Sequence, residues 1–327
     1  MYFAMDGIGY ENTEKIEYEF TDIPGFDTFA KIDPITKGYS VNMKYCVTKK
    51  DGTKYLLRIA PIAQYESNKA LFDLQKQASN LGAPMCEPID FGICNAGVYS
   101  LQSWINGEDL EYVLPTLSKA EQYKLGIKAG EILRKIHSIP VPSSHIEYWT
   151  AKPINEDWEV RFNRTLDNAI YEYNKSSLRF DGDDKVINYI KENRYLLKCR
   201  PISFGFDDFN VFNMMLSHGR LVIIDFERYN ICDPWEEFGD IVWSVKFSPH
   251  FATGQICGYF CGEPPDEFFK LLALYSSEYL LAFWKLHPIT TDFGQKVTLP
   301  LSQNILQWFD GMKNHVPTWY LKDWEIQ

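Results

Sequence analysis

A two-lobed α+β fold is predicted for this chain of 327 residues, with a small β-rich lobe followed by a larger, mainly helical lobe. Three observations predict it. A β-hairpin pattern lies near the beginning of the chain, at residues 41–60. Apolar stripes with the period of an α-helix dominate the second part. A second, isolated hairpin pattern at residues 214–224 interrupts that helical part and ends in acidic and amide side chains.

The β-rich part begins with the alternating run VNMKYCV, an Asp51-Gly52 turn and the second run KYLLRIA. A turn dipeptide between two β-rich runs is typical of a hairpin. A helix is then expected from about Glu66 to Leu81, because its apolar residues share one face and Gly82 stands where a C-cap glycine belongs.

The run GVYSLQSWI predicts a further strand that ends near Asn106-Gly107, a turn that suits a hinge. We therefore expect an N-lobe of residues 1–104 and a C-lobe of residues 105–327. In the C-lobe, Ser118 and Glu121 form a capping box ahead of an apolar helical stripe. The runs PDEFFKLLALYSSEYLLAFW and SQNILQWFDGM predict two more helices.

The isolated hairpin carries the functional argument. Its two strands, MML and LVII, flank the turn SHGR, so Asn213 and Asp225 lie at nearly equal distances from the turn and meet at its open end. An amide oxygen beside a carboxylate is a hard-oxygen pair that suits magnesium. Asp208 lies five residues before Asn213, close enough for a loop to bring it to the same point. Each residue alone also fits a turn or a cap; the joint spacing favours a phosphate and metal site.

Composition excludes several classes of protein. The formal net charge is −11 and no long run of Lys or Arg occurs, so we expect no nucleic-acid partner. The acidity suits a cationic substrate, or else only keeps the protein soluble. The seven cysteines contain no C-x-x-C pair, so neither a disulfide framework nor a zinc site is expected. The chain begins without the pattern of a signal peptide and its most apolar run is too short to span a bilayer, so a cytoplasmic protein without a membrane partner is expected, as a monomer or homodimer.

The segments FDDFNVFN (206–213) and IDFERYNICDP (224–234) resemble the aminoglycoside phosphotransferase and choline kinase superfamily. That family carries H-G-D-x-x-x-x-N, a short hairpin and I-D-x-x-x-x-x-x-D-P. The runs KGYSVNMKYCV, YLLRI, QSWINGEDL and LGIKAGEILRKIHSIP extend the resemblance over nearly the whole chain. It implies a kinase-like fold and transfer of the γ-phosphoryl group of ATP, or of GTP, to a hydroxyl of a small molecule such as an aminoglycoside or an amino alcohol.

The resemblance makes Asp208 the catalytic aspartate and Asn213 and Asp225 the ligands of Mg²⁺. Asp233-Pro234 and Glu237 take the places of residues that we expect to hold the structure. Arg58 stands where the family has the lysine that contacts the nucleotide phosphates.

The remaining expected nucleotide contacts lie in the N-lobe. Glu66 is the expected partner of Arg58, with Asp73 as a weaker candidate. Backbone N–H groups at Gly38 and Ser40 are expected to approach the phosphates. The backbone of Ser103, Trp104 and Ile105 is expected to meet the nucleobase, between apolar walls.

Two departures from the family pattern keep an alternative open. Phe206 and Asp207 replace the motif's histidine and glycine, and Arg58 replaces its lysine. These changes favour a catalytically impaired, nucleotide-binding regulator as the second hypothesis. A protein kinase is the third, and the absence of H-R-D, D-F-G and A-P-E segments weighs against it.

Overall fold

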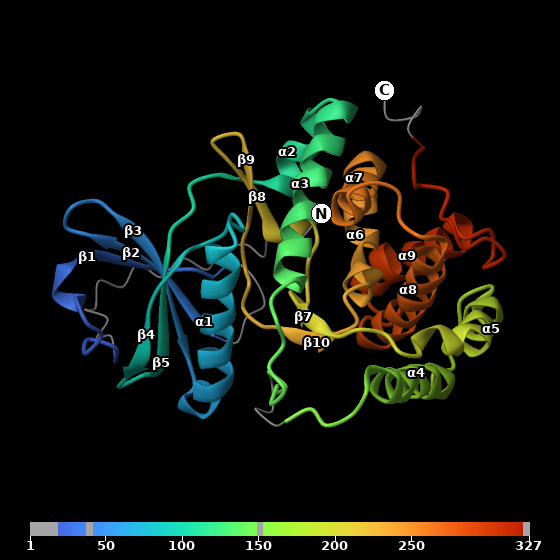
Figure 1. The fold of residues 1–327 in the computed structure, drawn as a ribbon, viewed down its shortest axis with the longest axis horizontal. Coiled ribbons are helices and arrows are strands. Elements are labelled where there is room, and N and C mark those ends of the chain that lie inside the picture. Colours follow the sequence, from blue (N-terminus) through green and yellow to red (C-terminus); the bar gives the residue numbers. More distant parts are fainter. Residues whose placement is uncertain (1–18, 37–41, 149–152, 323–327) are drawn as a thin grey trace.

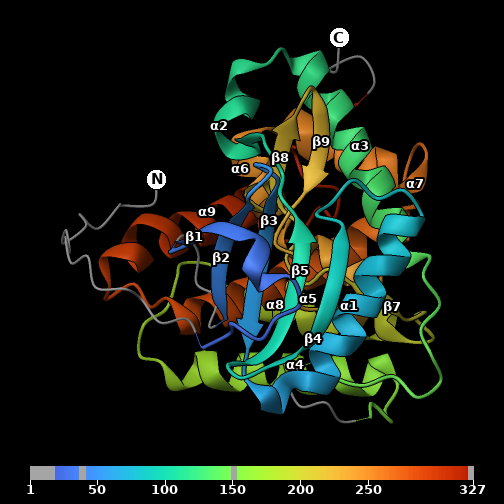
Figure 2. The same ribbon diagram turned by 90° about the vertical axis from the view of Figure 1, so that its left-hand side faces the viewer.

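The N-terminal part of the molecule is a five-stranded antiparallel sheet covered by one helix, α1 (Tyr65–Asn80), as Figures 1 and 2 show. The computed structural model describes residues 19–36, 42–148 and 153–322. The order of the strands is β1-β2-β3-β5-β4. Their bounds are β1 Phe29–Pro34, β2 Met43–Lys49, β3 Lys54–Ala60, β4 Pro88–Cys94 and β5 Gly97–Ser103.

The predicted elements of this part are confirmed. Strands β2 and β3 form the expected hairpin, and Gly52 in its turn has a φ of +87°, a backbone conformation that favours glycine. Helix α1 begins one residue before the predicted start. It ends at Asn80, and Gly82 follows with a φ of +74° as the predicted C-terminal glycine.

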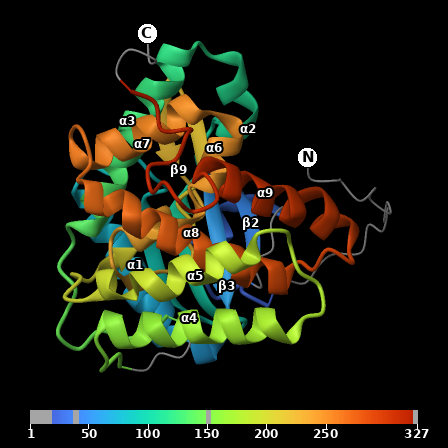
Figure 3. The ribbon, with the colours of Figure 1, turned by 90° about the vertical axis from the view of Figure 1, so that its right-hand side faces the viewer.

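The C-terminal part is mainly helical, and its outer side is formed by α4, α5, α8 and α9 (Figure 3). Two small sheets lie between these helices and the N-terminal sheet: β6-β8-β9 contains the predicted isolated hairpin, and β7 pairs with β10. The helices are α2 Leu110–Val113, α3 Lys119–His137, α4 Trp158–Lys175, α5 Asp183–Asn193, α6 Val242–Phe247, α7 Pro249–Phe260, α8 Asp266–Leu286 and α9 Leu299–Trp308. The strands are β6 Glu108–Asp109, β7 Ser203–Gly205, β8 Met214–Ser217, β9 Arg220–Ile223 and β10 Asn230–Cys232.

Helix α1 fixes the sheet against the helical part. Its buried residues Leu71, Leu74 and Ala78 belong to the large hydrophobic core that continues through α3, α7 and α8. A separate small core lies on the other face of the sheet and includes Leu57 and Ile59 of β3. Because side chains alternate along a strand, Arg58 points to the opposite face, toward the helical part. The two-lobed α+β architecture is thus confirmed.

Helices α3 and α7 cross with their backbones almost in contact. Each helix carries two glycines four residues apart, Gly126 and Gly130 on α3 and Gly254 and Gly258 on α7. A Cβ atom on Gly130 would lie 2.1 Å from the carbonyl oxygen of Gln255. The predicted capping box of Ser118 and Glu121 is present at the start of α3. The role of these glycines as the packing surface of the helix was not predicted from the sequence.

Replacing Gly130 by alanine should destabilise the protein. In an exposed helix the change would stabilise by about 1 kcal/mol, because alanine is the better helix former. Here the added methyl group meets rigid backbone atoms, and overpacking of this kind costs typically 1–3 kcal/mol or more. Urea denaturation should show the loss, whereas Lys124→Ala on the exposed side of α3 should stay within about 0.5 kcal/mol of the wild type. An equally stable Gly130→Ala protein would contradict the close crossing.

Two further observations concern expectations from composition. None of the helices in the described ranges is long and apolar enough to cross a membrane. All seven cysteines are free thiols.

Candidate active site

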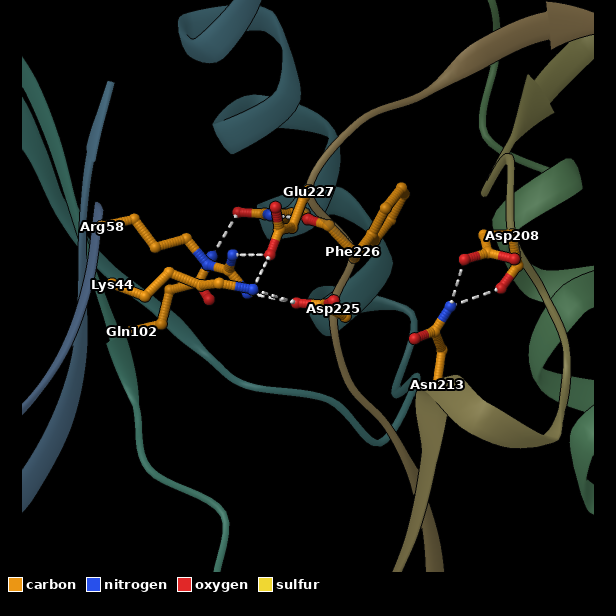
Figure 4. A network of polar contacts seen from close by, with 9 residues as sticks. Lys44, Arg58, Gln102, Asp208, Asn213, Asp225, Phe226 and Glu227 are labelled. Atoms are coloured by element: carbon orange, nitrogen blue, oxygen red, sulfur yellow. Dashed lines mark hydrogen bonds and ion pairs between the residues drawn. The ribbon is translucent and has the colours of Figure 1, made fainter. Parts of the chain in front are cut away.

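Two basic side chains point from the N-terminal sheet toward the helical part. Lys44 of β2 lies directly opposite Arg58 of β3 in the antiparallel register, so both side chains leave the same face of the sheet. The guanidinium of Arg58 is buried and donates to Asp225, with 2.9 Å between Nη2 and Oδ1, and also to Glu227. The ammonium of Lys44 lies 2.8 Å from Oε1 of Glu227 (Figure 4). Two cations and two carboxylates thus share one partly buried cluster.

The backbone after β9 explains why two acids reach these cations. Asp225 has a φ of +61°, the left-handed region that a non-glycine residue adopts only under constraint. The N–H of Glu227 donates to the carbonyl of Asp225 over 2.8 Å, which closes a tight turn. Burial and the neighbouring Glu227 raise the pKa of Asp225, and the Arg58 guanidinium opposes that rise.

The loop before the hairpin holds Asp208 by both carboxylate oxygens. The amide nitrogen of Asn213 lies 2.8 Å from Oδ2, and that of Asn210 lies 2.6 Å from Oδ1. Asn210 is itself buried and also donates to Asp240 over 3.0 Å. The orientation of the Asp208 carboxylate is therefore fixed before any substrate arrives.

The open end of the hairpin carries Asn213 and Asp225, but their side chains are directed to different partners. The backbone N–H of Ile224 donates to the carbonyl of Asn213 over 2.9 Å. Asp225 is the next residue after this backbone hydrogen bond. Figure 4 shows Asn213 directed to Asp208 on one side, and Asp225 directed to Arg58 and Lys44 on the other. The amide oxygen of Asn213 accepts no hydrogen bond from the residues that the structure describes.

The expected ion pair between Arg58 and Glu66 is wrong. Glu66 is exposed in the first turn of α1, whereas Arg58 is buried and takes its counter-charges from Asp225 and Glu227. The weaker candidate, Asp73, is an exposed residue that pairs with Lys69 four residues earlier on the same helix. The two candidates were chosen because they lie close to Arg58 in the sequence. The actual partners are far from it in the sequence and come from the other lobe.

Other predicted nucleotide contacts have mixed outcomes. Gly38 and Ser40 lie outside the described residues. The N–H of Ser103 donates to the carbonyl of Glu87 over 2.9 Å, so this group is already engaged and does not face a nucleobase freely. Trp104 and Ile105 follow the end of β5 in an irregular, half-buried linker between the two parts of the chain.

Several residues of the site were missed by sequence reasoning. Lys44 could have been found from the sequence, because it lies opposite Arg58 in the predicted hairpin and its side chain leaves the same face of the sheet. Glu227 lies two residues after Asp225, but only the left-handed turn makes the two side chains converge. Gln75 of α1 donates to the carbonyl of Phe226 over 2.5 Å and accepts from Gln102 over 2.9 Å, which links helix, sheet and site.

Phe206, which replaces the motif's histidine, is packed rather than hydrogen-bonded through its side chain. Its ring stacks on Phe226 at a centroid distance of 4.6 Å and meets the edge of Phe209 at 5.4 Å. Its backbone N–H donates to Glu237 over 2.6 Å. The loop that carries Asp208 is therefore supported by an aromatic stack and one buried carboxyl group.

Asp233 and Glu237 were expected to hold the structure, and their contacts confirm it. Asp233 is fully buried and accepts from Arg200 at 2.6 and 3.1 Å and from the hydroxyl of Tyr275 at 2.7 Å. Removing one partner of such a buried, hydrogen-bonded pair is strongly destabilising. Glu237 supports the loop through Phe206, as described above.

Buried acids gather behind the loop that carries Asp208. Burial, reinforced by repulsion from Asp207, raises the pKa of Glu237 to about 8. Burial and nearby carboxylates also raise the pKa of Glu236 and of Asp240. Part of this acidic cluster is therefore protonated near neutral pH and carries less charge than the sequence implies.

The stability of the protein should fall between pH 5 and pH 8, and Glu237→Gln should reduce that fall. In this window the folded state holds a proton on Glu237 that the unfolded state has released, so unfolding becomes easier as the pH rises. A shift of this size is worth a few kcal/mol at most. Glutamine keeps an acceptor for the N–H of Phe206 and cannot ionise. Thermal unfolding across this pH range is the measurement, with exposed Glu267→Gln as the control; parallel curves for Glu237→Gln and wild type would contradict the prediction.

A β-rich part joined by a linker to a helical part, with an aspartate-bearing loop and a short hairpin at their junction, defines a kinase-like fold. The chain belongs to the phosphotransferase enzyme family, whose model matches residues 31–269. A search of curated proteins finds no match.

Solved structures with the same fold include three informative ones. A choline/ethanolamine kinase family protein from Mesorhizobium loti is 16% identical, with 91% of this chain and 95% of that chain covered at a TM-score of 0.60. A thermostable mutant of aminoglycoside phosphotransferase APH(4)-Ia is 14% identical, with 88% and 98% covered at a TM-score of 0.62. Amicoumacin kinase hAmiN, in complex with AMP-PNP, Ca²⁺ and Ami, is 13% identical, with 87% and 90% covered at a TM-score of 0.55.

Proposed function

We propose that this protein is a small-molecule kinase that transfers the γ-phosphoryl group of ATP, or of GTP, to a hydroxyl group of a small acceptor. The observation that carries the proposal is the carboxylate of Asp208, held at both oxygens by amide groups beside the open end of the hairpin. Phosphoryl transfer depends mainly on positioning and charge neutralisation, and a fixed carboxylate next to a cation-lined junction suits both.

In this proposal Asp208 orients the acceptor hydroxyl and accepts its proton. Arg58 and Lys44 bind the nucleotide phosphates from the sheet, where a guanidinium can form a fork and an ammonium acts as a point charge. The nucleobase lies near Trp104 and Ile105, and the backbone N–H groups of Gly38 and Ser40, which lie outside the described residues, are proposed to bind the phosphates. The N-lobe, residues 1–104, thus supplies most of the nucleotide contacts, and the C-lobe, residues 105–327, supplies the catalytic loop.

The donor set at the hairpin fits Mg²⁺. Asn213 offers an amide oxygen without a protein partner among the described residues, and Asp225 offers a carboxylate that is 38% exposed at its side chain. Both are hard oxygen donors, and Mg²⁺ usually takes one or two protein oxygens together with phosphate and water. When bound, the ion would neutralise charge on the phosphates.

Similar proteins support the nucleotide assignment. One solved structure of APH(4)-Ia is a ternary complex with ADP and hygromycin B, and another contains AMP-PNP. An aminoglycoside-like compound or an amino alcohol is accordingly among the acceptors that we propose.

A nucleotide-binding regulator without catalytic activity is the second candidate. Asp225 is already paired with Arg58 and lies 3.6 Å from the ammonium of Lys44, so a metal ion has to compete with two protein cations for this carboxylate. Phe206 in the histidine position is the second feature that favours it.

Nucleotide binding followed by turnover separates the two functions. Mg·ATP should raise the melting temperature, and ATP consumption should increase with at least one member of a panel of hydroxylated amines and aminoglycosides. Binding without consumption across the whole panel would favour the regulator. Absence of binding to both ATP and GTP would refute both.

A further inference from the structure

A second cavity, of about 180 Å³, opens beside the catalytic loop and is not part of the nucleotide site described above. Its volume is that of several water molecules, enough for a small functional group with its attachment. We call it the Arg161 pocket. Its lining includes Tyr148, Ile154, Arg161, Asp207, Tyr229 and Asn230.

Arg161 is an unusual residue in this lining. Of the five N–H donors of its guanidinium, one has a protein acceptor in the described chain, the carbonyl of Ile231 at 2.6 Å. The guanidinium lies over the buried ring of Trp158, 5.1 Å from its centroid. Its Nε is buried without a partner. The side chain is thus held in place by an aromatic face and one carbonyl, with most of its donors unused.

The other half-buried or buried arginines of the described chain all have a carboxylate partner. These pairs are Arg58 with Asp225, Arg194 with Asp167, Arg200 with Asp233 and Arg228 with Asp207. Arg161 has no carboxylate within ion-pair distance among the described residues. Burial lowers its pKa, and the charges of Glu147, Glu156 and Glu236 oppose that fall from beyond ion-pair distance. An arginine stays charged in proteins, so this partly buried cation has no direct counter-ion to offset its desolvation.

The pocket lies next to the proposed reaction centre. Arg161 bonds to Ile231 of β10, and β10 pairs with β7, whose end leads directly into the catalytic loop. Asp207 lines the pocket and Asp208 follows it immediately, with their Cα atoms about 3.8 Å apart. A group bound at Arg161 can therefore belong to the same small molecule that presents its hydroxyl to Asp208.

The acids near the pocket do not supply the missing counter-ion. Asp207 is engaged by Arg228, and Glu147, which also lines the pocket, is exposed and makes no ion pair with Arg161. A cationic group would be repelled by the unpaired guanidinium, whereas an oxyanion would meet several free donors.

We infer that the Arg161 pocket binds an oxyanion of the acceptor, a carboxylate or a phosphate ester, and that Arg161 is the residue that selects it. The inference rests on the proposed function, since it names the chemical class of the acceptor for that same site. Acceptors that combine a free hydroxyl with an anionic group are accordingly the preferred substrates.

Calorimetric titration with matched pairs of small molecules tests the inference. The pairs are glycerate and glycerol, 4-hydroxybutyrate and 1,4-butanediol, and glycerol 3-phosphate and glycerol. Saturating Mg·ADP keeps the anions away from Lys44 and Arg58. At least one anion should bind wild type tenfold or more tightly than its uncharged partner, and comparison of the pairs distinguishes carboxylate from phosphate. Arg161→Gln should remove the preference, and Arg161→Lys should restore part of it.

The exposed Arg164, three residues further along α4 and paired with Glu156, provides the control, because Arg164→Ala should leave the preference unchanged. The melting temperature and Mg·ADP affinity of each variant show that it is folded. The inference would be overturned if both members of every pair bound equally or if no anion bound. It would also be overturned if Arg161→Gln bound the anions as tightly as wild type. ATP consumption with uncharged or cationic acceptors alone would overturn it and leave the proposed function standing. Failure of Mg·ADP and Mg·ATP to bind would instead overturn the proposed function.

Discussion

Asp208→Ala should lower turnover by about 10²–10⁴-fold while leaving Mg·ATP affinity nearly unchanged, because a positioned proton acceptor contributes rate enhancement of that size. The carboxylate makes its hydrogen bonds to Asn213 and Asn210, and the cations that we assign to the phosphates contact other acids. Loss of Asp208 therefore removes the group that faces the acceptor and spares the nucleotide contacts. Steady-state kinetics with the best acceptor of the panel, together with calorimetric titration of Mg·ATP, provides both measurements.

Two variants make the result specific to the role of Asp208. Asp208→Asn keeps the shape of the side chain and should be nearly as inactive, since an amide is a poor proton acceptor. Asp73→Ala removes an exposed aspartate that pairs only with Lys69, and it should retain full turnover. Unchanged turnover of Asp208→Ala would rule out the assigned role, and a matching loss of nucleotide affinity would indicate a structural one.

The hairpin could be predicted from sequence because its signals are local. Two short apolar runs flank a turn in which His218 and Gly219 both adopt positive φ values, and pairing of the strands then fixes where Asn213 and Asp225 lie. The spacing of the two residues from the turn was enough to predict their positions at the end of the hairpin. Chemistry that depends on neighbouring residues of one hairpin can be inferred in this way without coordinates.

The partners of Arg58 could not be predicted by the same reasoning. Asp225 and Glu227 lie 167 and 169 residues further along the chain, and they reach Arg58 only because the two lobes are packed together. No local pattern connects them. The candidates taken from the following helix, Glu66 and Asp73, were near in sequence and point to solvent.

Arg161 and the α3–α7 crossing show the same limit. The sequence presents Arg161 as an ordinary arginine of an amphipathic helix, and only the placement of β10 and Trp158 makes it an unpaired cation beside a cavity. The glycines of α3 look like weak points of a helix until α7 is seen against them. In both cases the property belongs to a contact between distant segments.

Asp225→Ala should remove most of the magnesium dependence of nucleotide binding. In wild type, ATP should bind more weakly when EDTA removes the metal, because Asp225 and Asn213 are the proposed protein ligands. Losing the carboxylate should weaken Mg·ATP binding by roughly 10–100-fold, the range seen when groups that support a metal site are removed. Binding of ATP without metal should change much less, because Arg58 and Lys44 remain. Calorimetric titrations with and without Mg²⁺ measure both quantities.

Glu227→Gln is the matched control, because Glu227 shares the same two cations but is not assigned to the metal. It should keep the difference between titrations with and without Mg²⁺, whereas Asp225→Ala should lose it. The comparison separates two roles for an acid in this cluster: holding the cations in place, which both residues do, and binding the metal, which we assign to one. If Asp225→Ala retained the full magnesium dependence, Asp225 would only position Arg58, and the metal would have to be held elsewhere.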